Sequence, residues 1–215
     1  MVQGMGVVQA IVFDLGETLV DETRMWKIIA YEAQVPLLTF AGVLGGVIER
    51  RLPHSAVFAE LGIEPIEASD HGYRLESSDF YPDAIPTLHA LQDLGYRLGI
   101  AGNQPVGAVE QLAGLDLPLD LIASSTTLGV AKPDPRFFEQ IVERLGVPAG
   151  SIVYVGDRLD NDVLPAQAIG MQAVFIRRGP WGYIHANWPQ IARVKYQISS
   201  LSELPDILGR ITDNG

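Results

Sequence analysis

The segment VVQAIVFDLGETL, residues 7 to 19, decides the fold of this chain. Its first seven residues are nearly all apolar and do not alternate with polar ones, which is typical of a strand buried on both faces of a parallel sheet. The run ends at Asp14, and Gly16 follows two positions later. Because ligands bind beyond the carboxyl ends of strands in open parallel sheets, Asp14 is the first candidate functional side chain.

Five more apolar runs follow along the chain: YRLGIAG (96–102), LDLIAS (119–124), SIVYVG (151–156), AVFIR (173–177) and KYQIS (195–199). Helical patterns with clear ends lie between them. Residues 134 to 145 have Asp134 as an N-cap, Pro135 at the first helical position and Gly146 after the last turn. This alternation of strands and helices predicts an α/β fold with a doubly wound parallel sheet.

Residues 22 to 80 interrupt the alternation with a segment that has no strong strand pattern. Apolar side chains recur there at helical spacing: Phe40, Val43, Leu44, Val47 and Ile48. A loop of this length without secondary structure is improbable in a compact domain, so we expect an inserted helical subdomain. The predicted organisation is an α/β core of residues 1–21 and 81–215 with a helical insertion at 22–80.

The composition describes a globular protein, with 47% hydrophobic and 19% charged residues among 215. Its formal net charge of −11 argues against nucleic acid as a partner, because phosphate-backbone binding depends on Lys and Arg. The chain has no cysteine, which excludes disulfides and thiolate metal sites. Any bound metal would therefore use oxygen or histidine ligands.

The N-terminal residues MVQGMGVVQA have no basic region and lead directly into the first apolar run, which argues against an export signal. No stretch of the sequence approaches the ~20 apolar residues that a membrane-spanning helix needs. We therefore expect a soluble, cytoplasmic protein with no membrane partner. The oligomeric state stays open at this stage.

Asp14 and Asp157 come directly after the first and fourth of these apolar runs, Gly102 and Asn103 end the second, and Lys132 in GVAKPDP follows the third. The carboxyl ends of parallel strands meet at one edge of a sheet, so we expect these residues to converge.

Each of these residues has an ordinary explanation when taken alone. Asp14 alone would be explained by capping of a turn, and Lys132 alone by a solvated position in a loop. Capping of the next helix would explain Asp157, Asp160 and Asp162. Independent capping does not predict an acid, a lysine and an acid in this order on one edge. The joint pattern therefore favours a functional site, with capping kept as the role of Asp160.

The chain resembles the haloacid dehalogenase-like hydrolases in three segments and in the region between the first two. These are FDLGETL (13–19), GVAKPDPRFFEQIVERLGV (129–147), IVYVGDRLDNDVLPAQAIGM (152–171) and, between the first two, YPDAIPTLHALQDLGYRLGIAGN (81–103). The resemblance implies a Rossmannoid sheet with a mobile cap. The insertion at 22–80 lies where a helical C1-type cap belongs in that family.

The resemblance also implies the chemistry of the site. Asp14 would be the nucleophile that forms an aspartyl-phosphate, which splits one displacement into two steps. Mg²⁺ would be held by the carboxylates of Asp14 and Asp157 and by the backbone carbonyl of Gly16, with Asp162 orienting the metal site. Lys132 would neutralise charge between the nucleophile and the phosphoryl oxygens.

Two positions depart from the phosphatases of this family. Gly16 stands where an acid normally protonates the leaving group, and Gly102 stands where a Ser or Thr hydroxyl normally contacts phosphate. Backbone N–H groups at Gly102 and Asn103 remain as predicted phosphate donors, together with Lys132. Glu17 is adjacent to the missing acid and is a candidate replacement, although neighbouring side chains usually point apart.

Three hypotheses for function follow. The first is a Mg²⁺-dependent phosphatase acting on a small phosphorylated metabolite, which the pair Asp157 and Asp162 favours. The second is a carbon–halogen hydrolase that uses the same aspartate without metal. The third is a binding or regulatory protein that has lost turnover. Phosphonate cleavage is less supported, because it uses a cap lysine and Lys27 is the only lysine in the insertion.

The substrate itself is not readable from the sequence. The candidate recognition groups in the insertion are Arg24, Trp26, Arg50, Arg51, His54 and Arg74. The aromatic segment RGPWGYIHANW, residues 178 to 188, is predicted to pack rather than to bind ligand, because aromatic side chains commonly bury apolar area.

Overall fold

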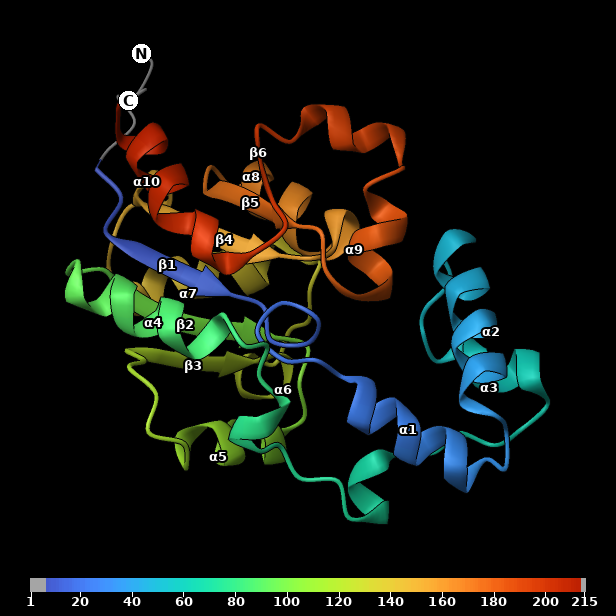
Figure 1. Cartoon of the computed structure of the whole chain (residues 1–215). Coiled ribbons are helices and arrows are strands. Elements are labelled where there is room, and N and C mark those ends of the chain that lie inside the picture. The colour runs from blue at the N-terminus through green and yellow to red at the C-terminus, as the bar shows by residue number, and fades with distance from the viewer. Residues whose placement is uncertain (1–6, 214–215) are drawn as a thin grey trace.

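Six parallel strands form a single sheet in the computed structural model, which describes residues 7–213 (Figure 1). The strands are β1 (Ala10–Phe13), β2 (Arg97–Gly102), β3 (Leu121–Ser124), β4 (Ile152–Gly156), β5 (Gln172–Ile176) and β6 (Tyr196–Ile198). Every strand lies within one of the six apolar runs or overlaps it. The prediction of a doubly wound parallel α/β sheet is therefore confirmed.

The strand order β3-β2-β1-β4-β5-β6 places β1 at the centre of the sheet. Ile11 of β1 is in register with Leu98 of β2 on one side and with Val153 of β4 on the other. The chain runs outward from β1 to β3 and then returns to the other side of β1 as β4. The order therefore reverses between β1 and β4, and this is where ligands bind in open α/β sheets.

Helices cover both faces of the sheet (Figure 1). The sheet therefore lies between two apolar layers of the core. The core helices are α4 (Ala84–Asp93), α5 (Val106–Ala113), α6 (Ser125–Leu128), α7 (Pro135–Leu145), α8 (Leu164–Ala168), α9 (Gly179–His185) and α10 (Leu204–Asp213). One layer joins side chains of α4 and α10 to the sheet, and the other joins those of α7 and α8. Both layers are needed because the central strands β1 and β4 are buried on two sides.

The helix α7 illustrates how local sequence sets these boundaries. Asp134 accepts a hydrogen bond from the backbone N–H of Arg136, and Pro135 occupies the first turn. The helix ends at Gly146, whose φ of 64° is the left-handed conformation that glycine tolerates. Phe137, Phe138, Ile141 and Leu145 point into the core from one face.

The segment between β1 and α4 is helical and lies beside the sheet (Figure 1). It contains α1 (Thr23–Glu32), α2 (Leu37–Glu49) and α3 (Ala56–Leu61), and we call residues 23–79 the helical segment. It has its own apolar cluster, which includes Trp26, Phe40 and Phe58. Separate burial of this kind explains why its pattern stands apart from the sheet in the sequence.

The two ends of the helical segment leave the sheet side by side. Val20 and Phe80 form an antiparallel bridge, and the N–H of Asp21 donates to the carbonyl of Asp79 at 2.8 Å. The Arg24 guanidinium pairs with Asp79 at the same junction. The entry and exit of the segment are therefore tied to each other.

The helical segment also contacts the core at a second place, where α2 packs against α9. The ring of His54 lies edge-on to that of Trp181, with centroids 6.4 Å apart, and Arg51 stacks over Trp188. Both tryptophans are buried. The two tryptophans of the aromatic segment 178–188 therefore pack as predicted, whereas Tyr183 in the same segment is exposed.

Within residues 7–213, no single helix has the length and apolar character to cross a membrane. Among the helices of this described range, only α1 and α2 taken together reach that length and composition, and they are bent by 110° relative to each other.

Candidate active site

The centre of the site is a buried lysine between two carboxylates. Lys132 Nζ donates to Asp14 Oδ1 at 2.7 Å and to Asp162 Oδ1 at 2.6 Å. Asp14 directly follows β1, and its backbone N–H is fixed to the carbonyl of Val155 on β4 at 2.9 Å. The Lys132 side chain is 1% exposed, so this is an interior ion cluster rather than a surface pair.

Asn103 holds Lys132 in place. Its Oδ1 accepts from the Lys132 backbone N–H at 2.8 Å, and its Nδ2 donates to the Lys132 carbonyl at 3.0 Å. Burial alone would lower the pKa of Lys132, but the carboxylates of Asp14 and Asp162 outweigh burial and raise the pKa well above its usual value. Lys132 is therefore a permanent cation at the end of the sheet.

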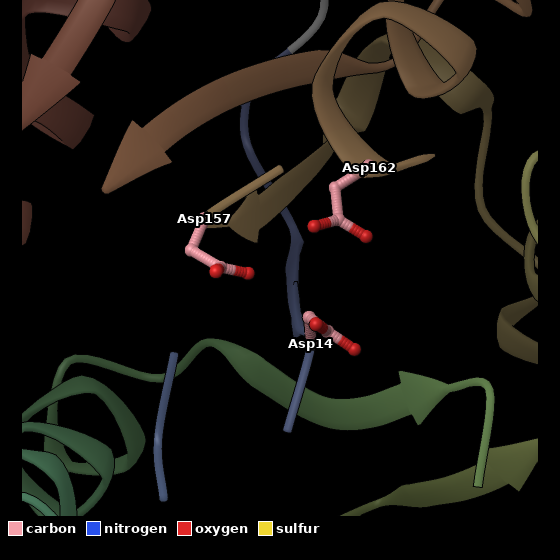
Figure 2. Close-up of side chains that lie close together, drawn as sticks. All are labelled: Asp14, Asp157 and Asp162. Atoms are coloured by element: carbon pink, nitrogen blue, oxygen red, sulfur yellow. The ribbon is translucent and has the colours of Figure 1, made fainter. Parts of the chain in front are cut away.

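Three aspartates converge at this point, as Figure 2 shows. Asp14 comes from the end of β1, Asp157 from the end of β4, and Asp162 from the single π-helical turn Leu159–Val163. One carboxylate oxygen from each lies within 4.8 Å of the other two. The structure thus brings together the predicted site residues that follow β1 and β4, the two strands between which the strand order reverses.

The electrostatics of this cluster are unfavourable for three negative charges. Burial, followed by the charges of Asp162 and Asp14, raises the pKa of Asp157 well above its usual value. Burial also raises the pKa of Asp162 to about 6, although Lys132 opposes the shift. Asp157 Oδ2 is buried and has no hydrogen-bond partner among the described residues. One lysine therefore does not satisfy the three acids.

This donor set fits a divalent cation of the magnesium type. Three carboxylates are hard oxygen ligands, and Asp157 Oδ2 is a buried acceptor without a hydrogen-bond partner among the described residues. A buried acceptor without a partner costs free energy, and a cation would remove that cost.

The space beside Gly16 is already filled by another acid. A Cβ placed on Gly16 would lie 2.2 Å from Glu22 Oε1 and 2.8 Å from Glu22 Cδ. Burial, then the nearby carboxylates of Glu17 and Asp14, raises the pKa of Glu22 to about 8. Sequence reasoning missed Glu22, because nothing in its spacing connects it to position 16.

Glu17, the candidate replacement acid, is held by another partner. Its Oε2 accepts from the Tyr81 hydroxyl at 2.5 Å, and its Oε1 accepts from the backbone N–H of Glu22 at 3.3 Å. Glu17 also has a φ of 55°, which is uncommon for a residue with a side chain. Its carboxylate joins the start of the helical segment to the core.

Gly102 lies directly against the predicted nucleophile. A Cβ at this position would be 2.7 Å from Asp14 Oδ1, so a serine or threonine would displace the carboxylate from its present position. The close approach of Asp14 to Gly102 therefore leaves no room for a hydroxyl side chain at position 102.

A cavity of about 500 Å³ extends from Asp14 and Lys132 to the helical segment. Its walls include several apolar side chains from that segment: Met25, Trp26, Ile29, Phe58 and Ile66. Arg158 and Trp181 contribute from the core side. The site is therefore reached through a largely apolar chamber.

Of the six predicted recognition groups, Trp26 and His54 line this cavity. The four arginines have other partners, which sequence spacing does not reveal: Arg24 pairs with Asp79, Arg50 with Glu60, Arg51 stacks on Trp188, and Arg74 donates to the carbonyls of Ser69 and Tyr73. None of these four arginines is among the described residues that line the cavity.

The parallel sheet, the reversal of strand order at β1 and the lysine–aspartate cluster at that edge describe a Rossmann-like α/β protein with a candidate active site. The chain belongs to the haloacid dehalogenase-like hydrolase family, whose model matches residues 8–170. The family resemblance seen in the sequence is thereby confirmed.

Curated relatives of the chain include both phosphatases and dehalogenases. It is 41% identical over 104 residues to a glyceraldehyde 3-phosphate phosphatase of Methanopyrus kandleri, a match that covers 47% of this chain and 45% of the relative. It is 36% identical over 141 residues to (S)-2-haloacid dehalogenase 1 of a Pseudomonas species, covering 61% and 57%. The chain thus spans about half the length of these relatives.

Solved structures match over nearly the whole chain. A HAD phosphatase from Thermococcus onnurineus is 28% identical with a TM-score of 0.62, and the match covers 94% of this chain and 98% of that one. A predicted phosphoglycolate phosphatase from Haemophilus somnus is 20% identical with a TM-score of 0.71, covering 95% and 99%. The second comparison supports the fold alone.

Proposed function

We propose that this hydrolase is a magnesium-dependent phosphatase that acts on a small phosphate monoester through an aspartyl-phosphate at Asp14. The observation that carries the proposal is the convergence of three buried carboxylates whose charge Lys132 alone does not balance. The phosphatases among the relatives support the same reading. A carbon–halogen hydrolase would attack with the same aspartate and would not need a cation.

In this proposal Asp14 attacks phosphorus from the end of β1, and Lys132 compensates charge as the carboxylate and the phosphoryl oxygens approach. Asp162 acts on Lys132 through the 2.6 Å hydrogen bond, which fixes the ammonium group. The two bonds from Asn103 to the backbone of Lys132 fix the other end of the same residue. Both contacts reduce the motion of the charged group that faces the substrate.

Asp157 and Asp14 would hold Mg²⁺ with Asp162 nearby, and the cation, when bound, would supply charge neutralisation for the phosphoryl group. We also propose that the Gly16 carbonyl is a ligand of the cation. The backbone N–H groups of Gly102 and Asn103 would donate to the phosphate.

The helical segment would act as the cap of the site. Its apolar side chains form much of the chamber wall, so closure over the substrate would exclude water from Asp14. Because the four arginines have other partners, Lys132 and Arg158 are the Lys and Arg side chains among the described residues that line this chamber. We therefore propose a substrate with a single phosphate and a compact organic part.

The test is hydrolysis of a panel of phosphate monoesters and 2-haloacids, with Mg²⁺ or with excess EDTA. Phosphate release that requires Mg²⁺ and disappears in Asp14→Asn is the expected result. Halide release that persists in EDTA would replace the proposal with a dehalogenase. Absence of both reactions would favour a binding role.

A further inference from the structure

The space that a side chain at position 16 would use is occupied by a carboxyl group from elsewhere. The three atoms nearest to a Cβ built on Gly16 all belong to the carboxyl group of Glu22, at 2.2, 2.8 and 3.4 Å. No backbone atom is among them. Glu22 therefore places its functional group where the first atoms of a residue-16 side chain would lie.

Glu22 is also free of the structural role that its position suggests. It stands at the N-cap of α1, a position where a side-chain oxygen can accept a hydrogen bond from the first turn. The structure shows no such bond from its side chain in the described part of the chain. The side chain instead lines the cavity that contains Asp14 and Lys132.

We propose that Glu22 is a catalytic residue of this protein, the carboxyl group that donates a proton to the leaving group and then accepts one from the attacking water. The proposal rests on the phosphatase function proposed above. It assigns the missing proton donor to Glu22, which directly precedes α1 at the entry to the helical segment, rather than to position 16.

The reaction would take place in two steps. A carboxylate oxygen of Asp14 forms a bond to phosphorus while the bond from phosphorus to the ester oxygen breaks, and the Glu22 proton passes to that oxygen to give an alcohol. A water molecule then attacks phosphorus and gives one proton to the Glu22 carboxylate. The bond from phosphorus to Asp14 breaks, which releases inorganic phosphate and restores both acids.

The location of Glu22 has a structural consequence. It is the last residue before α1, so its position relative to Asp14 depends on how the helical segment meets the sheet. Glu17 Oε1 accepts from the backbone N–H of Glu22 and thereby fixes that junction. Glu17 is thus a positioning residue in this scheme, because it acts on Glu22 and not on substrate.

The test is the dependence of kcat/KM on the pKa of the leaving alcohol, measured with Mg²⁺ on aryl and alkyl phosphates. In Glu22→Gln, kcat/KM for alkyl phosphates should fall by ~10²–10⁴, the usual contribution of a general acid. The loss should be smallest for p-nitrophenyl phosphate, whose leaving group needs little protonation. A burst of p-nitrophenol equal to the enzyme concentration should appear, because the second step lacks its base.

Two further variants separate catalysis from folding. Gly16→Ala introduces a Cβ that displaces only the end of the Glu22 side chain, so it should also lose alkyl phosphate hydrolysis preferentially. The double variant Gly16→Asp with Glu22→Ala returns an acid to the vacated space and should recover part of that loss. Recovery is not expected if Glu22 only stabilises the junction.

The outcomes distinguish the two proposals. If wild type hydrolyses aryl phosphates with Mg²⁺ and Glu22→Gln shows the same leaving-group dependence, the assignment of Glu22 is wrong while the phosphatase function stands. If wild type hydrolyses no phosphate ester, both are overturned.

Discussion

Replacement of Asp157 by asparagine should make the metal-free protein more stable. Asp157 lies within 4.8 Å of both Asp14 and Asp162, measured between carboxylate oxygens. At an effective dielectric constant of about 20, each pair of full charges at that distance repels by about 3.5 kcal/mol. Lys132 hydrogen-bonds the other two acids, so Asp157 is the member that gains least from it.

Protonation sets the upper limit of the effect. A carboxyl with an unfolded-state pKa of 3.8 takes up a proton at pH 7.5 at a cost of about 5 kcal/mol, so Asp157 is not destabilising by more than that. With part of the repulsion offset by Lys132, we expect Asp157→Asn to raise the free energy of unfolding by about 2–4 kcal/mol. For a chain of this size that corresponds to a rise in Tm of about 5–12 °C.

The pH dependence has a defined sign. The folded-state pKa of Asp157 is raised, so its contribution to stability is present below the unfolded pKa of 3.8 and is lost as pH rises. The advantage of the variant should therefore grow with pH and vanish near pH 4.

The assay is calorimetric unfolding in EDTA and again in millimolar Mg²⁺. Wild type should gain stability with Mg²⁺ and Asp157→Asn should not, because one ligand is weakened. Asp160→Asn is the matched control, since Asp160 is 42% exposed and pairs with Arg158. An equal or lower Tm for Asp157→Asn in EDTA would refute the charge argument, and an equal Mg²⁺ response would remove Asp157 from the metal site.

Three further outcomes are expected. Asp14→Asn should abolish phosphate release and leave the far-ultraviolet circular dichroism spectrum unchanged; normal turnover would exclude Asp14 as nucleophile. Lys132→Met should lower the free energy of unfolding by about 3–5 kcal/mol, because it leaves buried acids unpaired, and a stable variant in EDTA would contradict this. Burial lowers the pKa of His185 to about 4, so about 3 kcal/mol of stability should be lost as pH falls from 6.5 to 4. His185→Asn, which keeps an acceptor for the Leu159 N–H, should flatten that dependence in urea titrations at several pH values.

The strands were predictable because each one is a short continuous run of apolar residues in the sequence. β1 and β4 are buried at every position, and such runs contain no polar alternation. The same reasoning placed Asp14, Lys132 and Asp157 at one edge, because topology alone brings the carboxyl ends of these strands together. Once these strand ends lie side by side, their side chains are close enough to contact one another.

Contacts between the helical segment and the core were not predictable in this way. Glu22 fills the space beside Gly16 only because α1 begins at a particular angle, and no sequence period encodes that angle. The partners of Arg24 and Arg51 likewise depend on tertiary placement. Long flexible side chains reach many partners, so their sequence position carries little information about which one they choose.

The bridge between Val20 and Phe80 makes the helical segment topologically equivalent to a hairpin turn for the rest of the chain. Loop-closure entropy changes by only about 0.6 kcal/mol for each doubling of loop length, so the sheet is nearly indifferent to how many residues the turn contains. Insertions of other sizes and sequences are compatible with the same strands at this junction. Exchange of the helical segment alone would give Asp14, the proposed nucleophile, access to a different set of molecules.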